Sequence, residues 1–127
     1  MRIALGVLFI LHGVAHLPGF LVPWRLAAPA DMPYTTTVLG GVVDLGPVGI
    51  RAVSTLWLLA ALAFVVVGVA TFRGEAGWPT LALGVTLFSL VLSVLGWPQA
   101  RVGLVLNLVL LAYLFLGARL GWLPSSS

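Results

Sequence analysis

The fold is decided by residues 3–22, which read IALGVLFILHGVAHLPGFLV and contain no Asp, Glu, Lys or Arg. An α-helix needs about 20 mostly apolar residues to cross the hydrocarbon core of a bilayer, and this run has that length. The apolar core of a secretory signal peptide spans only about 7–15 residues. We therefore expect residues 3–22 to stay in the protein as a membrane span.

Three further apolar runs follow along the chain, over residues 50–72, 80–96 and 102–120. The ends of the four runs carry tryptophans, whose amphipathic rings favour the membrane–water interface; these are Trp24, Trp78, Trp97 and Trp122. The two connections after residues 72 and 96 are short, which makes neighbouring helices antiparallel. The sequence therefore predicts an all-α fold, an integral membrane four-helix antiparallel transmembrane bundle. It forms a single domain over residues 1–127.

The composition is that of a chain whose solvent is lipid. Hydrophobic residues make up 61% of the sequence and charged residues only 7%, against roughly 25% charged residues in soluble domains. Six arginines outnumber three acids, but they are scattered singly, and a nucleic-acid interface needs a basic patch or stripe. The absence of cysteine excludes disulfides and thiolate metal sites. We expect the lipid bilayer as a partner and no nucleic acid.

The connection between the first two runs, residues 23–49, is much longer than the others. It holds four of the eight prolines and both aspartates, and no pattern in it indicates regular structure. Long connections of this kind are often functional or fold back as a lid. We expect this loop, with Tyr34 near its middle, to cap one end of the bundle. Ion pairs should hold the cap, between two arginines at the rim and the two aspartates (Arg51, Arg101, Asp31 and Asp44).

The polar residues inside the spans gather in one half of the bundle. A helix rises about 1.5 Å per residue, so depths can be compared between antiparallel spans. His16, Thr55, Ser93 and Asn107 come out at a similar depth beneath loop 23–49. Ligand sites are mostly apolar cavities with a few converging polar groups. We predict that the largest internal pocket opens in this half, lined by His16, Asn107 and residues near Thr55 and Ser93. The predicted ligand-binding residues are His12, His16, Thr55, Ser93 and Asn107.

The two histidines lie four residues apart on one helix face. They should face the interior, because a polar ring exposed to hydrocarbon loses its hydrogen bonds. Three roles are open: interhelical hydrogen bonds to Asn107 or Ser93, a pocket or proton-handling role for a quinone or another lipid-soluble molecule, and a metal or haem ligand pair. No acid or cysteine lies at the same depth to complete a ligand set, so we expect no metal. Asn107 should bond to another helix, to His16 first and to Ser93 next.

Small residues repeat along two of the spans, and the repeats predict close helix packing. Ser54, Ala61 and Gly68 recur every seven residues in the second run. In the third run, a stripe of small and hydroxyl residues comprises Ala82, Thr86, Ser89, Ser93 and Gly96. Such residues let helices approach closely in lipid.

The start of the first run resembles the DoxX family of small four-helix bacterial membrane proteins. Residues 2–13 read RIALGVLFILHG, with the Arg, the Gly and Phe and the His-Gly pair that open that family's first helix. The four-span layout, the long first loop and the pair Gly19-Phe20 agree as well. His16 departs from the pattern, because the family usually has Lys there, so a titratable group replaces a permanent charge.

The resemblance implies a multi-pass protein of the bacterial inner (cell) membrane. It favours cytoplasmic termini. The positive-inside rule does not decide the orientation, because three arginines lie on each side of the predicted bundle. The family includes subunits associated with thiosulfate-to-quinone electron transfer and with oxidant-defence complexes. We therefore expect an accessory or binding component that holds a lipid-soluble small molecule such as a quinone, or that supports a membrane assembly.

Two alternatives belong to other functional classes. One is a redox or enzyme subunit that uses His12 and His16 directly. The other is a transporter or channel protomer active as a homo-oligomer, because four short spans leave little room for a pore of their own. The sequence does not specify a cofactor.

Overall fold

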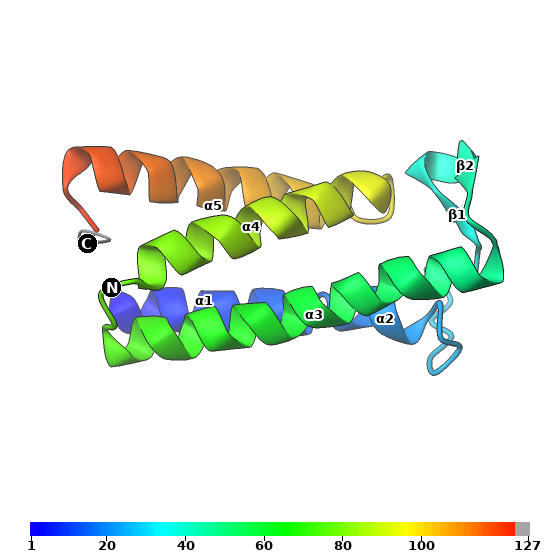
Figure 1. Ribbon diagram of the computed structural model, residues 1–127, viewed down its shortest axis with the longest axis horizontal. Coiled ribbons are helices and arrows are strands. Elements are labelled where there is room, and N and C mark those ends of the chain that lie inside the picture. Colours follow the sequence, from blue (N-terminus) through cyan, green and yellow to red (C-terminus); the bar gives the residue numbers. More distant parts are fainter. Residues whose placement is uncertain (124–127) are drawn as a thin grey trace.

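The computed structural model describes residues 1–123, and these form the helical fold that the sequence predicts (Figure 1). The helices are α1 (Arg2–Val14), α2 (Leu17–Leu21), α3 (Gly46–Arg73), α4 (Trp78–Leu95) and α5 (Arg101–Leu120). Four segments are long and apolar enough to span a membrane: Arg2–Leu21, Gly46–Arg73, Trp78–Leu95 and Arg101–Leu120. The four predicted runs are thus confirmed as helical segments.

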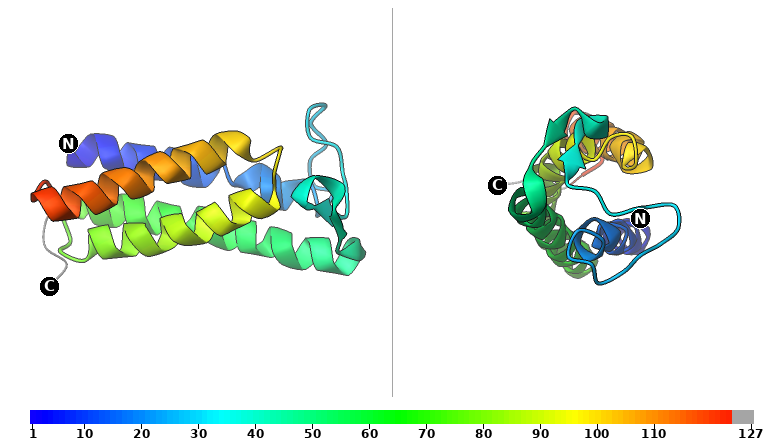
Figure 2. Two further views of the ribbon diagram at one scale, coloured as in Figure 1. Left: turned by 90° about the horizontal axis from the view of Figure 1, so that it is seen from above. Right: turned by 90° about the vertical axis from the view of Figure 1, so that its right-hand side faces the viewer.

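The helices lie along one long axis and leave two different ends (Figure 1). One end, called the loop end below, holds the connection between α2 and α3 and the turn between α4 and α5. The opposite end holds the start of α1 and the turn between α3 and α4. The closest helix pairs are α1 with α3, α4 with α5 and α3 with α4. Seen from the loop end, α1 and α5 lie further apart than the helices of these three pairs (Figure 2, right).

The first span is broken, although the sequence predicts one continuous run. Pro18 has no amide hydrogen to donate to the carbonyl of Val14, and its ring crowds that turn of helix. The backbone amide of His16 accordingly donates to Gly13 O at 3.0 Å, one residue short of the regular helical partner. The break frees the carbonyl of His12, which becomes available to a side chain.

The α1–α3 contact depends on small residues, as the repeat in the second run predicts. A Cβ added to Gly68 would lie 2.5 Å from Ile10 Cγ1 and 2.9 Å from Gly6 O. A Cβ on Gly13 would lie 2.8 Å from Ala61 O. The two backbones therefore approach closely enough that only glycine fits at these points. Ser54, Ala61 and Gly68 are all buried.

The hydrophobic core fills the half of the bundle opposite the loop end. Phe9, Phe64 and Trp78 meet there, with the Phe9 and Trp78 ring centroids 6.2 Å apart. Trp78 is the first residue of α4, at a segment end as predicted, but its ring is buried at 2% exposure. The chain turns inward at the start of α4, and the ring packs between helices. The other span-end tryptophans, Trp24, Trp97 and Trp122, have exposed rings.

The long loop is more ordered than the sequence indicates. It contains a small antiparallel hairpin of β1 (Thr37–Val38) and β2 (Val43–Asp44), joined by a 3-10 turn at Leu39–Gly41. Gly40 and Gly41 both take positive φ angles, which glycine adopts without steric cost. The loop ends at residue 45 rather than 49, because Pro47 is tolerated in the first turn of α3.

The predicted ion pairs across the loop end are wrong. Among residues 1–123 the structure shows one ion pair, between Arg73 and Glu75 at the opposite end. Asp44 instead accepts hydrogen bonds from the Thr36 hydroxyl at 2.7 Å and from the Gly46 amide at 3.0 Å. Arg51 lies over the ring of Trp24. The aspartate is therefore used locally to close the hairpin.

Candidate functional site

The buried polar side chains of the first span, α4 and α5 meet in one hydrogen-bonded group, which we call the polar cluster. It consists of His12, His16, Ser89, Ser93 and Asn107, each at most 4% exposed. His12 Nε2 lies 2.8 Å from Asn107 Oδ1, and His16 Nε2 lies 2.6 Å from Ser89 Oγ. The Asn107 amide nitrogen donates to Ser89 Oγ at 2.9 Å and to Ser93 Oγ at 3.1 Å. Both histidines thus face the interior, as predicted.

The break in the first span fixes the direction of these hydrogen bonds. His16 Nδ1 lies 2.6 Å from the carbonyl oxygen of His12. A carbonyl oxygen can only accept, so Nδ1 carries the hydrogen, and in a neutral ring Nε2 is then an acceptor. The Ser89 hydroxyl must therefore donate to His16 and accept from the Asn107 amide. Asn107 Oδ1 is left to accept from His12 Nε2, which closes a ring of bonds that starts and ends at His12.

The prediction of hydrogen-bond partners for Asn107 is half right. Asn107 bonds to Ser93 as predicted, but its histidine partner is His12 and not His16. The His16 side chain is drawn back towards the carbonyl of His12, which leaves its other nitrogen to Ser89. Thr55 does not join the cluster, because its hydroxyl donates to Arg51 O on its own helix at 2.9 Å.

Aromatic rings enclose the histidines. The Phe64 ring lies 4.7 Å from the ring of His12 and 5.2 Å from that of His16, measured between centroids. The Trp57 ring lies 5.3 Å from His16. Glycines flank Trp57 on two sides, since a Cβ on Gly19 would lie 2.6 Å from its ring and one on Gly96 3.1 Å. Trp57 is therefore held firmly against the polar cluster.

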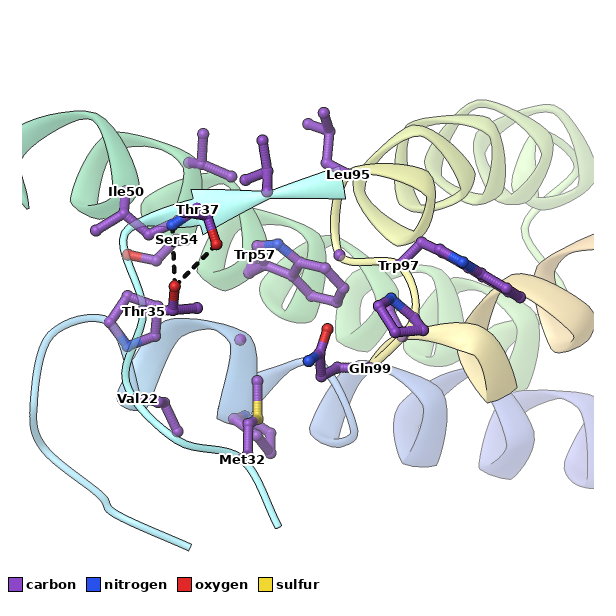
Figure 3. A pocket seen from close by; sticks show the side chains of 18 of the residues that line it. Val22, Met32, Thr35, Thr37, Ile50, Ser54, Trp57, Leu95, Trp97 and Gln99 are labelled. Carbon is purple, nitrogen blue, oxygen red and sulfur yellow. Dashed lines mark hydrogen bonds between the residues drawn. The ribbon is translucent and has the colours of Figure 1, made fainter. Parts of the chain in front are cut away.

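A cavity of about 580 Å³ opens on the other side of Trp57, beneath the long loop (Figure 3). Its walls come from α2, the start of α3, the hairpin and the α4–α5 turn. Thr35, Thr37, Ser54 and Gln99 supply polar groups, and the rest of the lining is apolar side chains, proline and glycine. No charged side chain lines the cavity among the residues that the structure describes.

The position of this cavity agrees with the prediction, and its lining agrees in part. His12, His16, Ser93, Asn107 and Thr55 are all absent from the walls, as are Tyr34 and Asp44. The predicted lining by His16 and Asn107 is wrong because the polar cluster satisfies its own hydrogen bonds below Trp57. Residues near Thr55 and Ser93 do line the cavity as predicted, namely Ser54 and Gly96. A role in ligand binding for His12, His16, Thr55, Ser93 and Asn107 stays a prediction.

Trp57, Gly19, Gly96 and Gln99 line the pocket, although sequence reasoning did not assign them to it. Trp57 lies within a span rather than at its end, where an interfacial role does not explain a tryptophan. Glycines near the ends of two different spans, at 19 and 96, are the second available signal. Together, the tryptophan and the two glycines indicate that the Trp57 ring packs where two other helices have no side chain in the way.

Within residues 1–123, no group of three or more His, Cys, Asp or Glu side chains lies close enough together to hold a metal ion.

Comparison with protein-family models, with curated proteins and with solved structures finds no match.

Proposed function

We propose that the chain is a multi-pass membrane protein whose four helical segments cross a bacterial cell membrane as an antiparallel bundle, with cytoplasmic termini. The apolar length of the four segments supports this. Leu and Val side chains are also exposed along every one of them, and a water-soluble protein would not expose so much apolar surface. Exposed Trp24, Trp97 and Trp122 lie near the segment ends, where interfacial rings are favoured.

The function that we propose for this protein is binding of an uncharged, lipid-soluble small molecule in the cavity beneath the long loop. The observation that carries the proposal is the cavity itself, about 580 Å³ with an apolar lining free of charge among the described residues. Ligand sites commonly enclose about 300–1,000 Å³ with a few polar groups that orient the ligand. The Gln99 amide and one hydroxyl of the bonded Thr35–Thr37 pair can donate to a ligand carbonyl. The Ser54 hydroxyl donates to Arg51 O at 2.8 Å and can only accept, from a ligand hydroxyl.

A quinone is the ligand that we favour, since it combines a neutral ring, two carbonyl oxygens and an apolar tail. The proposal agrees with a relationship to the DoxX family, which we retain on the strength of residues 2–13. In this proposal the polar cluster supports the wall of the cavity. It joins α1, α4 and α5 and backs Trp57 through His16.

The test uses detergent-purified protein and mass spectrometry of the small molecules that it retains. Val53 lines the cavity from α3, and Val53→Phe should fill part of it. Val109→Phe on α5 is the matched control, because Val109 is exposed on the outside of the bundle. We expect the wild type and Val109→Phe to retain a neutral lipophilic compound, and Val53→Phe to retain several-fold less. Equal retention by all three proteins would refute the pocket as the binding site.

A further inference from the structure

Arg25 occupies a backbone position that normally belongs to glycine. The amide of Leu26 donates to Leu21 O at 2.8 Å and that of Arg25 to Val22 O at 2.9 Å, the paired bonds of a Schellman motif that ends α2. Arg25 has φ of 58°, in the left-handed region that side chains other than glycine avoid. A strained residue of this kind is a reason to look for a function at that position.

Two arginines near this point lie on aromatic rings and not on acids. The guanidinium carbon of Arg25 lies 4.3 Å from the ring centroid of Tyr34, and that of Arg51 lies 5.3 Å from the ring of Trp24. In the part of the chain that the structure describes, neither arginine has a carboxylate in an ion pair. A guanidinium that stacks through its face still has its N–H edge free to bind an anion.

A second cavity, of about 310 Å³, adjoins Arg25. Val22, Pro29, Met32 and Tyr34 are among its lining residues, and Arg25 is the one charged residue in the lining as described. It adjoins the pocket of the proposed function, and Val22, Met32 and Pro33 contribute to both. The cavity therefore combines an apolar wall with a single cation at its edge.

We propose that this second cavity binds an anionic phospholipid. The phosphate is held by the N–H edge of Arg25, and the glycerol and first acyl carbons lie in the apolar cavity. A lipid is favoured over a free anion because the site combines a cation with apolar walls and sits beside the exposed Trp24, at the end of an apolar span. This inference rests on the proposed insertion in a membrane, but not on the neutral ligand.

The site can be tested with purified protein by native mass spectrometry, using phosphatidylglycerol, phosphatidylcholine and inorganic phosphate as separate probes. Arg25→Gly is the informative variant, because glycine relieves the left-handed strain while removing the cation. Arg25→Lys retains the charge. Arg119→Gln is the matched control, since Arg119 also lies over an aromatic ring, that of Phe115, but at the opposite end.

We expect the wild type to prefer phosphatidylglycerol, and Arg25→Gly to bind it about fivefold more weakly, as loss of one basic contact to an anionic lipid implies. Arg25→Lys and Arg119→Gln should keep most of the preference. Equal binding of the two lipids by the wild type, or an Arg25→Gly variant that binds like the wild type, would overturn the proposal. Binding of inorganic phosphate as strong as that of the lipid would also overturn it. Protein that fails to fractionate with membranes would instead refute the proposed function.

Discussion

At the scale of single residues, Asn107 makes more of the hydrogen bonds in the polar cluster than any other member. It is fully buried on α5 and bonds to His12 on α1 and to Ser89 and Ser93 on α4. Asn107→Ala would leave His12 Nε2 without an acceptor in an apolar surrounding. Because an unsatisfied buried polar group costs about 1–3 kcal/mol, we expect the free energy of unfolding in detergent to fall by about that amount.

Ser93→Ala provides the comparison for this experiment. Ser93 accepts one bond from Asn107 and lies outside the closed ring of bonds, so its loss should destabilise by less than the loss of Asn107. Denaturation of both variants with a denaturing detergent, followed by circular dichroism, measures the two effects. If Ser93→Ala proved as damaging as Asn107→Ala, the ring of bonds would not be the source of the stability.

The two histidines are expected to hold opposite tautomers. The His12 carbonyl forces the hydrogen of His16 onto Nδ1, and the bonds that follow around the ring place the hydrogen of His12 on Nε2. Nitrogen NMR of protein with labelled histidine distinguishes a protonated ring nitrogen from a bare one. Two histidines with the same tautomer would contradict these directions of donation around the ring.

The sequence predicts the members of the polar cluster better than their pairing. Helical rise alone places His16, Ser93 and Asn107 at one depth, since depth depends only on where each span begins. Pairing depends on side-chain direction, which Pro18 alters by freeing the carbonyl that His16 then binds. Ser89 belongs to the predicted stripe on the third run, yet only the structure shows that it links both halves of the cluster.

At the scale of helices, the α1–α3 contact should be sensitive to one added methyl group. Gly68→Ala would bring a Cβ within 2.5 Å of Ile10 and 2.9 Å of the backbone of Gly6. Overpacking of this kind typically destabilises by about 1–3 kcal/mol. Thermal unfolding in detergent should therefore show a lower midpoint for Gly68→Ala.

Gly84→Ala is the matched substitution on α4, where an added Cβ meets nothing within 4 Å. Alanine is the better helix former by about 1 kcal/mol, so this variant should be as stable as the wild type or slightly more stable. An equal loss of stability in both variants would show that the α1–α3 contact has no special role.

The hairpin should loosen in acid. The Gly46 amide and the Thr36 hydroxyl both bond the Asp44 carboxylate and hold its pKa below the usual value. A carboxyl whose pKa is lower in the folded state stabilises that state above its unfolded pKa of about 3.9, and the contribution is lost as the pH falls through the folded pKa. Hydrogen exchange at Gly46, corrected for the intrinsic pH effect, should show protection lost at acid pH. Asp44→Ala should lack this protection at neutral pH as well.

Periodicity and run length predict the helices but not their interruptions. The four runs are apolar throughout, so their approximate ends are visible in the sequence. The break after Val14 follows from Pro18, which an apolar run conceals because proline does not lower its hydropathy strongly. The sequence does not predict the hairpin, since strands of two residues are too short for any alternation to show.

At the scale of the whole molecule, the proposed topology can be mapped by labelling. The chain has no cysteine, so single cysteines can be introduced without background. Thr36→Cys in the loop and Glu75→Cys in the α3–α4 turn should react with a membrane-impermeant thiol reagent from opposite sides of the membrane. The orientation that we propose places Glu75 on the cytoplasmic side. Labelling of both positions from one side would contradict the antiparallel bundle.

The cavity is the part of the molecule that the sequence predicts least well. Depth arguments place it beneath the long loop because they concern whole helices. Its lining comes from several separate segments and consists mostly of apolar side chains, with glycine and proline at Pro18, Gly19, Gly40 and Gly96. Such residues carry no side-chain chemistry that would mark them as a site. Polar residues attract attention in a sequence, and here they satisfy one another one layer below.

The closed ring of bonds also sets a constraint on how the protein is made. His12 and Asn107 are 95 residues apart, and a ribosome adds about 5–20 residues per second. After His12 is synthesised, on the order of 5–20 s pass before Asn107 exists to accept its hydrogen. In the proposed membrane protein, the first segment therefore exists throughout that interval with a polar ring that lacks its partner. The nascent chain therefore depends for that time on water, on the insertion machinery or on the early α1–α3 contact.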